Sequence, residues 1–470
     1  MTLIDSLINW ESTEQVLVKK LALHPQRDDL QVLAAGEALI LVRNWYGQLM
    51  LLLPCNKEEL TRSSCGTLVI DLQNTAGSLA LSPWVLCRDE LFDAQSYWCD
   101  PSLMQLFKEE TSGASLTLLL LERQDKEKDW LTPAKKSDSV RPTKRCIFFS
   151  VKGGVGRSSA LTMLAITLAR RGKRVLVVDG DFESPGVSSS LLPAGDGQPE
   201  YGVVDWLTAQ ALGADIPSLE LMALEKAVAP SPLNAQLALQ GQVLVAPAYG
   251  SKTEAYVSKL ARTYRLSQDG KGYAQRLNEF LLTTETQHKI DITLFDCRAG
   301  IDDTAAAAIT QLQADISFLF AINTSQTWDS YRLLFKHLRR NPALFANVTT
   351  EDEEEEPWEL RSSLRLVSAL TPQEYGPYTG YSENLRQNAY ETFSEIYDAD
   401  SGEDRCAFSP APDDSEAPHA ALRIQWVEAL RAFSPLTEPA QVSDALNQAA
   451  FADFLNKATT LLGVDDEHST

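Results

Sequence analysis

The segment between residues 145 and 181 constrains the fold of this chain more than any other feature. It consists of an apolar run (RCIFFSV, 145–151), a glycine-rich loop, a helical stretch that ends at Gly172, and a second apolar run (KRVLVVDGD, 173–181). A helix between two buried strands joins them in parallel, through a right-handed crossover. The segment therefore predicts a parallel sheet covered by helices.

Further apolar runs extend this pattern along the chain. They predict strands at 242–248, 291–297, 316–323 and 364–370, with helices such as GYAQRLNEFLL between them. Apolar positions at helical spacing predict another helix at 442–462, and its excess of Asp over Lys favours core packing over membrane docking. We therefore expect an α/β domain with a doubly wound, mostly parallel sheet.

With 470 residues the chain is long enough for more than one core. Residues 1–123 alternate short apolar runs (36–43, 48–55, 67–72 and 115–123) with polar or helical stretches, which predicts a small α/β or α+β domain of unknown role. Residues 124–144 are mostly charged, small or Pro and predict a linker. The predicted α/β domain then occupies 145–470, with a C-terminal helical extension. For the acidic run 351–356 a solvated loop is favoured over an acidic docking site.

Charge and composition exclude several classes of function. The 42 Lys and Arg against 64 Asp and Glu give a formal charge of −22, which disfavours binding to nucleic acid or to an anionic membrane. The chain begins without a basic and apolar leader and has no apolar run long enough to span a bilayer, so we expect a cytoplasmic protein. The seven cysteines are never in CxxC spacing and the five histidines form no cluster, so free thiols are favoured over a metal site.

The loop from Lys152 to Ser159, KGGVGRSS, predicts a phosphate site. Its glycines (Gly153, Gly154 and Gly156, with Val155 between them) let successive backbone N–H groups point at an anion, and the helix that follows adds its positive N-terminus. Ser158, directly after the basic Arg157, can offer its hydroxyl to Mg²⁺. A tight strand-to-helix turn without a ligand would use the same residues.

Two acidic segments favour the phosphate site over the empty turn. The second strand ends in Asp179-Gly180-Asp181, and the later strand DITLFDC delivers Asp296 at its end, with Gly300 just beyond. A carboxylate at the end of an apolar strand suits a Mg²⁺-bound water, and the glycine allows the loop to move with a γ-phosphate. Each acidic strand end could by itself be only a helix cap or a solvated turn.

Together, KGGVGRSS, VVDGDFESPG and LFDCRAG resemble the deviant Walker A, Walker A′ and Walker B elements of the ParA/MinD-type P-loop ATPases of the SIMIBI class. The resemblance covers about residues 145–375. It implies that the loop 152–159 binds ATP and that Lys152 reaches across a homodimer to the partner's phosphates. It also implies that Asp181 orients the attacking water, that Ser158 binds Mg²⁺, and that Asp296 holds a Mg²⁺-bound water.

The sequence departs from this family at Arg157, where the usual loop has Lys. Arg keeps the charge and can bond two phosphate oxygens through its planar fork, but it is bulkier than an ammonium group. We therefore expect nucleotide binding with slow turnover. Arg298, in the D-x-R-x-G run 296–300, is a candidate for a phosphate or cross-subunit contact, with a surface salt bridge as the alternative.

The leading hypothesis is a weakly hydrolysing switch that dimerises around Mg-ATP and signals to an unidentified protein partner. Family members with accessory domains also occur in bacterial defence and other multi-gene systems, an analogy only. The alternatives are a catalytically silent nucleotide-sensing scaffold and a plasmid or chromosome partition ATPase. The last is disfavoured because residues 401–470 carry twelve Asp and Glu against four Lys and Arg. Asn323 and Pro372, each after a predicted strand, are positional candidates for contacts with the base.

Overall fold

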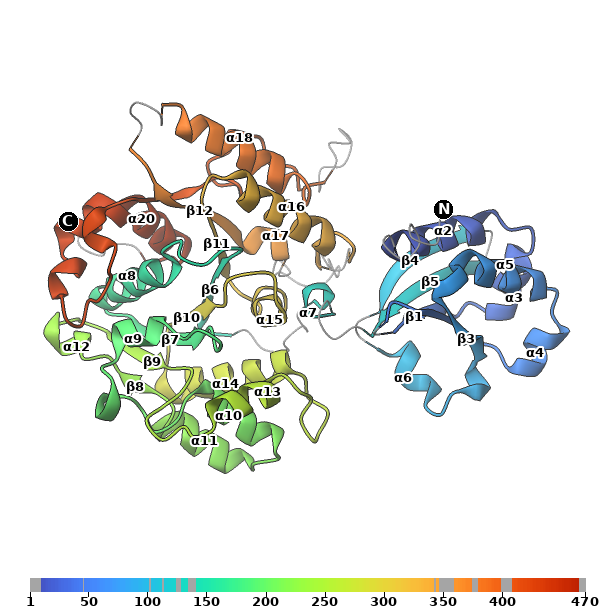
Figure 1. The fold of residues 1–470 in the computed structure, drawn as a ribbon, viewed down its shortest axis with the longest axis horizontal. Coiled ribbons are helices and arrows are strands. Elements are labelled where there is room, and N and C mark those ends of the chain that lie inside the picture. Colours follow the sequence, from blue (N-terminus) through green and yellow to red (C-terminus); the bar gives the residue numbers. More distant parts are fainter. Residues whose placement is uncertain are drawn as a thin grey trace. The chain divides into compact units, whose positions relative to one another are not determined.

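The computed structural model describes residues 10–44, 46–100, 103–111, 114–123, 128–133, 141–341, 344–345, 359–373, 379–398 and 408–464 (Figure 1). The chain divides into two compact units, Met1–Thr132 and Pro133–Thr470. The acidic run 351–356 and most of the predicted linker lie outside the described residues.

The first unit is a five-stranded mixed sheet with helices packed against it. The strand order is β3-β2-β1-β5-β4; β1 runs parallel to β5 and β2 to β3, while β1/β2 and β4/β5 are antiparallel. The strands are β1 Leu39–Arg43, β2 Leu49–Leu53, β3 Ala80–Cys87, β4 Met104–Thr111 and β5 Ala114–Glu122. The helices are α2 Trp10–Leu23, α3 Arg27–Ala34, α4 Lys57–Arg62, α5 Gly66–Ala76, α6 Ala94–Trp98 and α7 Lys128–Leu131. This region is therefore a small α/β unit.

One apolar run of the first unit is a helix and not a strand. Residues 67–72 lie within α5, where Leu68, Leu72 and Ala76 are buried. Their spacing of four places them on one helical face, which packs into the core. Within the predicted linker, the short helix α7 buries Trp130 and Leu131.

The second unit has the doubly wound, mostly parallel sheet that the sequence predicts. Its eight strands are ordered β13-β12-β11-β6-β10-β7-β9-β8, and only the β8/β9 pair is antiparallel. The strands are β6 Lys144–Ser150, β7 Arg174–Gly180, β8 Ala229–Pro230, β9 Gln242–Ala246, β10 Ile292–Cys297, β11 Ile316–Ala321, β12 Leu364–Thr371 and β13 Leu422–Gln425. Strand β6 lies at the centre, between β10 and β11 (Figure 1). The strands β10, β7, β9 and β8 lie on one side of it and β11, β12 and β13 on the other, so the strand order reverses at β6.

Helices cover both faces of this sheet. Phe148 of β6 contacts Phe454 of α20 on one face, and the next residue, Phe149, contacts Tyr331 of α16 on the other. The alternation follows from the strand period of two, because successive side chains point to opposite faces. The helices are α8 Arg157–Arg170, α9 Val187–Leu191, α10 Val203–Ala211, α11 Ile216–Glu225, α12 Leu233–Gln236, α13 Tyr256–Thr263, α14 Tyr273–His288, α15 Asp303–Gln311, α16 Ser325–Leu338, α17 Leu360–Ser363, α18 Tyr381–Phe393, α19 Asp444–Leu446 and α20 Ala452–Leu461.

The helix predicted at 442–462 is interrupted in its first half. A short turn at Pro439–Val442, α19 and a π-helical segment, Asn447–Phe451, precede the regular helix α20. Phe454, Leu455 and Ala458 of α20 are buried against α8 and the sheet. The apolar face is thus a core face, as the sequence predicts.

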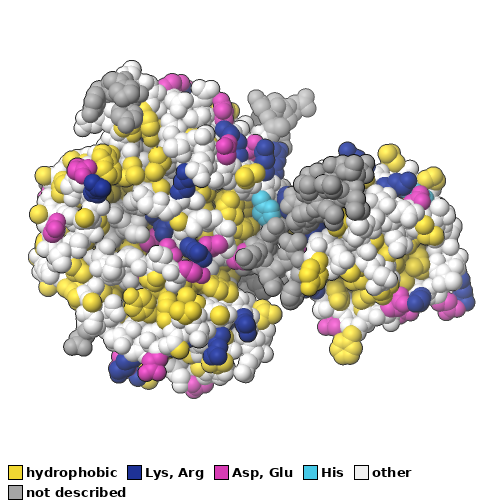
Figure 2. All heavy atoms as spheres, in the orientation of Figure 1, with side chains coloured by type: hydrophobic (Ala, Val, Ile, Leu, Met, Phe, Trp, Pro, Cys, Tyr) yellow, Lys and Arg dark blue, Asp and Glu magenta, His cyan; other side chains and the backbone are white. Residues whose placement is uncertain are grey.

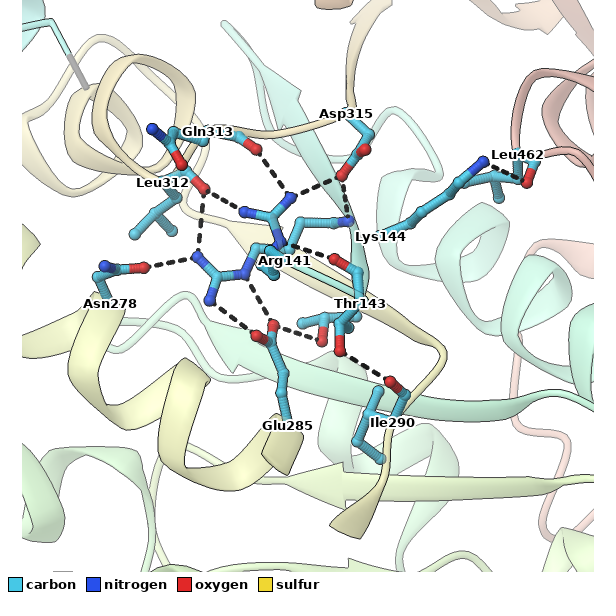
Figure 3. A network of polar contacts seen from close by, with 12 residues as sticks. Arg141, Thr143, Lys144, Asn278, Glu285, Ile290, Leu312, Gln313, Asp315 and Leu462 are labelled. Atoms are coloured by element: carbon cyan, nitrogen blue, oxygen red, sulfur yellow. Dashed lines mark hydrogen bonds and ion pairs between the residues drawn. The ribbon is translucent and has the colours of Figure 1, made fainter. Parts of the chain in front are cut away.

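A buried polar network fixes the start of β6 (Figure 3). The Arg145 guanidinium donates to both Glu285 oxygens at 2.7 and 2.8 Å and to the Asn278 side chain at 2.6 Å. Arg141 donates to the carbonyls of Leu312 and Gln313 and to the Asp315 carboxylate, 2.7 Å away. The chain is therefore tied to the second unit from residue 141 onwards.

Charges are mixed on the visible face of the second unit. In Figure 2 the Lys and Arg side chains lie among Asp, Glu and hydrophobic ones and do not merge into one basic area. In the parts of the chain that the structure describes, no helix has the length and apolar character needed to cross a membrane.

Candidate functional site

The turn from β6 into α8 forms an open backbone cradle. Gly154 and Gly156 have φ values of 74° and 78°, in the left-handed region that favours glycine, and α8 begins at Arg157. Among the described residues, no acceptor receives a hydrogen bond from the backbone N–H groups of 153–156. Unpaired N–H groups beside a helix N-terminus are suited to hold a phosphate, so the loop fits the nucleotide that the sequence predicts.

The two cations of this loop have different environments. Lys152 is half-buried, and in the described part of the chain it makes no hydrogen bond or ion pair. Arg157 is 8% exposed and its guanidinium is turned into the protein. The Lys152 ammonium is thus available to a group from outside, whereas Arg157 already has partners.

Arg157 joins three separate elements at the carboxyl edge of the sheet. Its Nε donates to Asp296 Oδ1 at 2.5 Å and its Nη1 to Ser150 Oγ, at the end of β6, at 3.0 Å. Its Nη2 lies 3.6 Å from Asp181 Oδ2, in the loop after β7. Burial by itself lowers the pKa of Arg157, but the attraction of Asp296 outweighs it and the pKa is raised.

Asp296 and Ser158 meet at the same point. The Ser158 hydroxyl donates to Asp296 Oδ2 at 2.6 Å, so both Asp296 oxygens receive a donor. Asp296 is 1% exposed and is the last residue but one of β10. In the sheet it pairs with Phe148 of β6 and with Asp179 of β7. A hydroxyl and a carboxylate are the oxygen ligands that Mg²⁺ prefers, so the pair fits a magnesium ion that also takes ligands from phosphate and water.

The described residues do not supply a complete metal site by themselves. Among the described residues, no group of three or more His, Cys, Asp and Glu side chains could hold a metal ion.

Asp181 is half-buried beside this cluster. Its Oδ1 accepts from the Ser184 N–H at 3.2 Å. Burial raises the pKa of Asp181 to about 6, against the opposing pull of Arg157. A carboxyl with a pKa in this range can change its protonation near neutral pH.

Asp179 is a site residue to which the sequence assigned no role. It is completely buried, and its Oδ2 accepts from the N–H groups of Gly186 and Ser188, both at 3.1 Å, and from the Ser188 hydroxyl at 2.7 Å. Burial, helped by the negative charge of Asp296, raises the pKa of Asp179 to about 7. Asp179 therefore anchors the loop that carries Asp181.

Gly180, between the two carboxylates, is required by close approach. A Cβ there would lie 2.3 Å from the Phe295 ring and 2.9 Å from the Asp296 carbonyl oxygen. The glycine therefore lets β7 and β10 bring their acidic ends together.

Arg298 lies at the rim of the site, with 42% of its side chain exposed. It is 3.4 Å from Glu183 and 3.6 Å from Asp302, and Glu183 also accepts from the Tyr264 hydroxyl at 2.8 Å. These contacts correspond to the salt-bridge alternative, and they connect the loop after β10 to the loop after β7. Glu183 could have been proposed from its place two residues after Asp181.

The remaining predicted residues are placed as follows. Val155 is buried and Ser159 half-buried, so neither side chain faces solvent freely. Asn323 follows β11 and is held by Trp328, Asn384 and Asn388. Pro372 follows β12 and is half-buried. The structure assigns neither of them to a base.

Fold and site together define a P-loop nucleotide-binding domain: a central parallel strand, a glycine loop with free N–H groups, and acidic strand ends beside it. Residues 146–357 match the family described as CobQ/CobB/MinD/ParA nucleotide binding domain. This part of the chain is therefore similar to the nucleotide-binding domain of that family.

The individual relatives are distant or match only a short segment. A curated protein, cytosolic Fe-S cluster assembly factor CFD1 of Yarrowia lipolytica, is 44% identical over 57 residues, which is 12% of this chain and 20% of that protein. The chain thus spans a fifth of the curated relative. A ParA family ATPase from Chlorobium tepidum TLS is 15% identical, with a TM-score of 0.37 over 68% of this chain and 98% of that one. A chain of the MinC:MinD cell division protein complex of Aquifex aeolicus is 14% identical, with a TM-score of 0.39 over 68% of this chain and 96% of that one.

Proposed function

We propose that this protein is a nucleotide-dependent switch that binds Mg-ATP at the loop 152–159, hydrolyses it slowly and forms a homodimer around it. The observation that carries the proposal is the contrast between the two loop cations. The open cradle of N–H groups and the inward Arg157 serve the chain's own site, and Lys152 is left available to a second nucleotide.

Each site residue has a defined task in this proposal. The N–H groups of the loop hold the phosphate chain, and Ser158 and Asp296 hold Mg²⁺, directly and through water respectively. When bound, Mg²⁺ neutralises charge on the β- and γ-phosphate oxygens. Asp181, with its pKa near 6, is ionised at neutral pH and can orient a water by accepting its proton in a hydrogen bond.

Slow hydrolysis is consistent with the contacts of Arg157. Its fork engages Asp296 and lies near Asp181, so both carboxylates are held by a protein cation in the absence of nucleotide. Productive geometry then requires these contacts to rearrange. Rearrangement of a buried ion pair is costly, which favours low turnover.

Light scattering of the full chain with and without Mg-ATP tests the switch. We expect the mass to double in Mg-ATP and to return to that of the monomer when the nucleotide is removed. A chain that stays monomeric in saturating Mg-ATP while binding it would contradict the dimer. A chain that binds no nucleotide would contradict the whole proposal.

A catalytically silent scaffold is the second candidate, favoured by the engagement of both carboxylates by Arg157. Single-turnover hydrolysis with bound ATP separates the two. Decay of bound ATP within minutes supports the switch, and bound ATP that persists for hours supports the scaffold.

The net charge of the chain and the presence of the first unit indicate what kind of partner the switch would contact. The formal charge of −22 and the mixed charges seen in Figure 2 favour a protein partner over nucleic acid or a membrane surface. We propose that the protein acts in the cytoplasm and that the first unit, Met1–Thr132, is the part available to contact a partner. A bacterial multi-gene system, such as a defence system, is one setting that suits this arrangement, and partition is the less favoured one.

A further inference from the structure

The Arg157 guanidinium already contacts carboxylates and a hydroxyl of the protein, as a bound metal cation would. Its guanidinium is almost fully buried and bonded to Asp296 and Ser150, with Asp181 3.6 Å away. Its partners come from β6, β10 and the loop after β7. A point between three strand ends is where an ion would neutralise the facing carboxylates.

The charges of the cluster require such a cation. Burial raises the pKa of Asp179 and of Asp181, and the nearby negative charge of Asp296 raises the pKa of both further. Buried like charges of this kind need an opposite charge nearby, because the interior screens them poorly. With Arg157 in place and the Ser158 hydroxyl on the other oxygen, each Asp296 oxygen already accepts one hydrogen bond, and the positive guanidinium repels a metal ion that approaches the same carboxylate.

We propose that Arg157 occupies the position of the divalent cation in the nucleotide-free protein and excludes Mg²⁺ from Asp296 and Asp181 until nucleotide phosphates draw the guanidinium away. This inference rests on the proposed nucleotide binding. It adds that the two cations exchange at Asp296, so that the divalent ion binds only together with the nucleotide.

The exchange has a physical basis because Asp296 and the phosphate oxygens of a nucleotide can both accept hydrogen bonds from Arg157. A guanidinium that leaves Asp296 loses a charge-assisted hydrogen bond, and phosphate oxygens offer it an equivalent or bidentate one. The carboxylates left behind then attract the incoming Mg²⁺. Magnesium without phosphate has no such exchange available, because the guanidinium would be left buried without a partner.

Binding of Mn²⁺ alone, measured by electron paramagnetic resonance without nucleotide, tests the exclusion. We expect no saturable Mn²⁺ binding to the wild type at sub-millimolar concentrations. Arg157→Ala should bind Mn²⁺ at least about tenfold more tightly, since the carboxylates have lost their cation. The gain should disappear when Asp296→Asn is added, because the carboxylate that takes the ion is then gone.

A matched control lies on the same helix. Arg170, at the other end of α8, forms a surface pair with Asp444, so Arg170→Gln should bind Mn²⁺ no better than the wild type. Equal Mn²⁺ affinity of wild type and Arg157→Ala would overturn the proposal. So would a gain that survives Asp296→Asn.

A second measurement uses the wild type and does not depend on the stability of the alanine variant. The ¹⁵N resonance of the Arg157 Nε–H, assigned by its loss in Arg157→Lys, should be unchanged by Mg²⁺ alone and should shift with Mg-ADP. A resonance that stays in place at saturating Mg-ADP would overturn the exchange while leaving nucleotide binding intact. Absence of ADP binding by calorimetry would instead overturn the proposed function.

Discussion

The replacement Asp179→Asn should change how the stability of the second unit depends on pH. Asp179 is fully buried, and its Oδ2 accepts three hydrogen bonds from Gly186 and Ser188. Its Oδ1 has no hydrogen-bond partner among the described residues. Asparagine has nearly the same shape and can present its amide oxygen to the same three donors. It therefore keeps the anchor and removes only the ionisation.

The direction follows from the raised pKa of Asp179. Its pKa is about 7 in the native state against the ordinary value of 3.8, so between these values the native protein binds one proton more than the unfolded chain. The free energy of unfolding then falls by about 1.4 kcal/mol for each pH unit as the pH rises. The stabilisation is complete below about pH 4 and is lost as the pH rises through 7. Between pH 5.5 and 7 the loss amounts to about 1.6 kcal/mol, and by pH 8 it reaches about 2 kcal/mol.

We expect Asp179→Asn to lack this loss and to gain about 2 kcal/mol relative to the wild type between pH 5.5 and 8. The assay is urea unfolding of the full chain in EDTA without nucleotide, followed by far-UV circular dichroism at several pH values. Asp444→Asn is the control, because that side chain is 93% exposed and its difference from the wild type should not depend on pH. A difference between Asp179→Asn and the wild type that stays constant across this range would refute the reasoning.

Four further predictions concern single residues. Lys152→Ala should keep monomeric ATP binding, measured by calorimetry, but weaken the ATP-dependent dimer by at least about thirtyfold in light scattering; equal loss of both would place Lys152 in its own subunit's site. Asp181→Ala should bind Mg-ATP normally and hydrolyse it at least about a hundredfold more slowly, and normal turnover would remove its assigned task. Arg157→Lys should bind ATP more weakly because a planar two-pronged donor is lost, and a variant that binds tighter and turns over faster would contradict this. Glu285→Gln should lower the free energy of unfolding by about 3 kcal/mol, since it leaves the Arg145 guanidinium buried without its carboxylate; a loss under about 1 kcal/mol would show that the network in Figure 3 contributes little.

The pattern of local residues was enough to predict the central fold of the second unit. Apolar runs at β6, β7, β10, β11 and β12 predict strands because each is buried on both faces, and a sheet covered by helices on both sides requires such runs. The sequence did not predict β8 and β13. These short strands lie at the two edges of the sheet, and so few residues carry little periodicity. The run 67–72 was predicted only as a short apolar segment, and in the structure it lies within the helix α5.

In the candidate site, too, some features follow from the local sequence and others only from tertiary contacts. The glycine loop, Ser158, Asp181 and Asp296 could be predicted because each depends on a strand end or a turn whose conformation is local. The anchoring role of Asp179 could not, since it depends on donors seven and nine residues away that only the folded loop brings back.

By itself the sequence determined that the chain contains a parallel sheet with a glycine-rich loop after one of its strands, because hydrophobic periodicity and glycine conformation act over a few residues. Only the tertiary structure decided the direction of the two loop cations. Arg157 and Asp296 are 139 positions apart, and they meet because β6 and β10 lie side by side in register and end at the same edge of the sheet. Where a long charged side chain goes depends on which buried carboxylate it can reach, and that is a property of packed neighbours and not of the residues next to it in the chain.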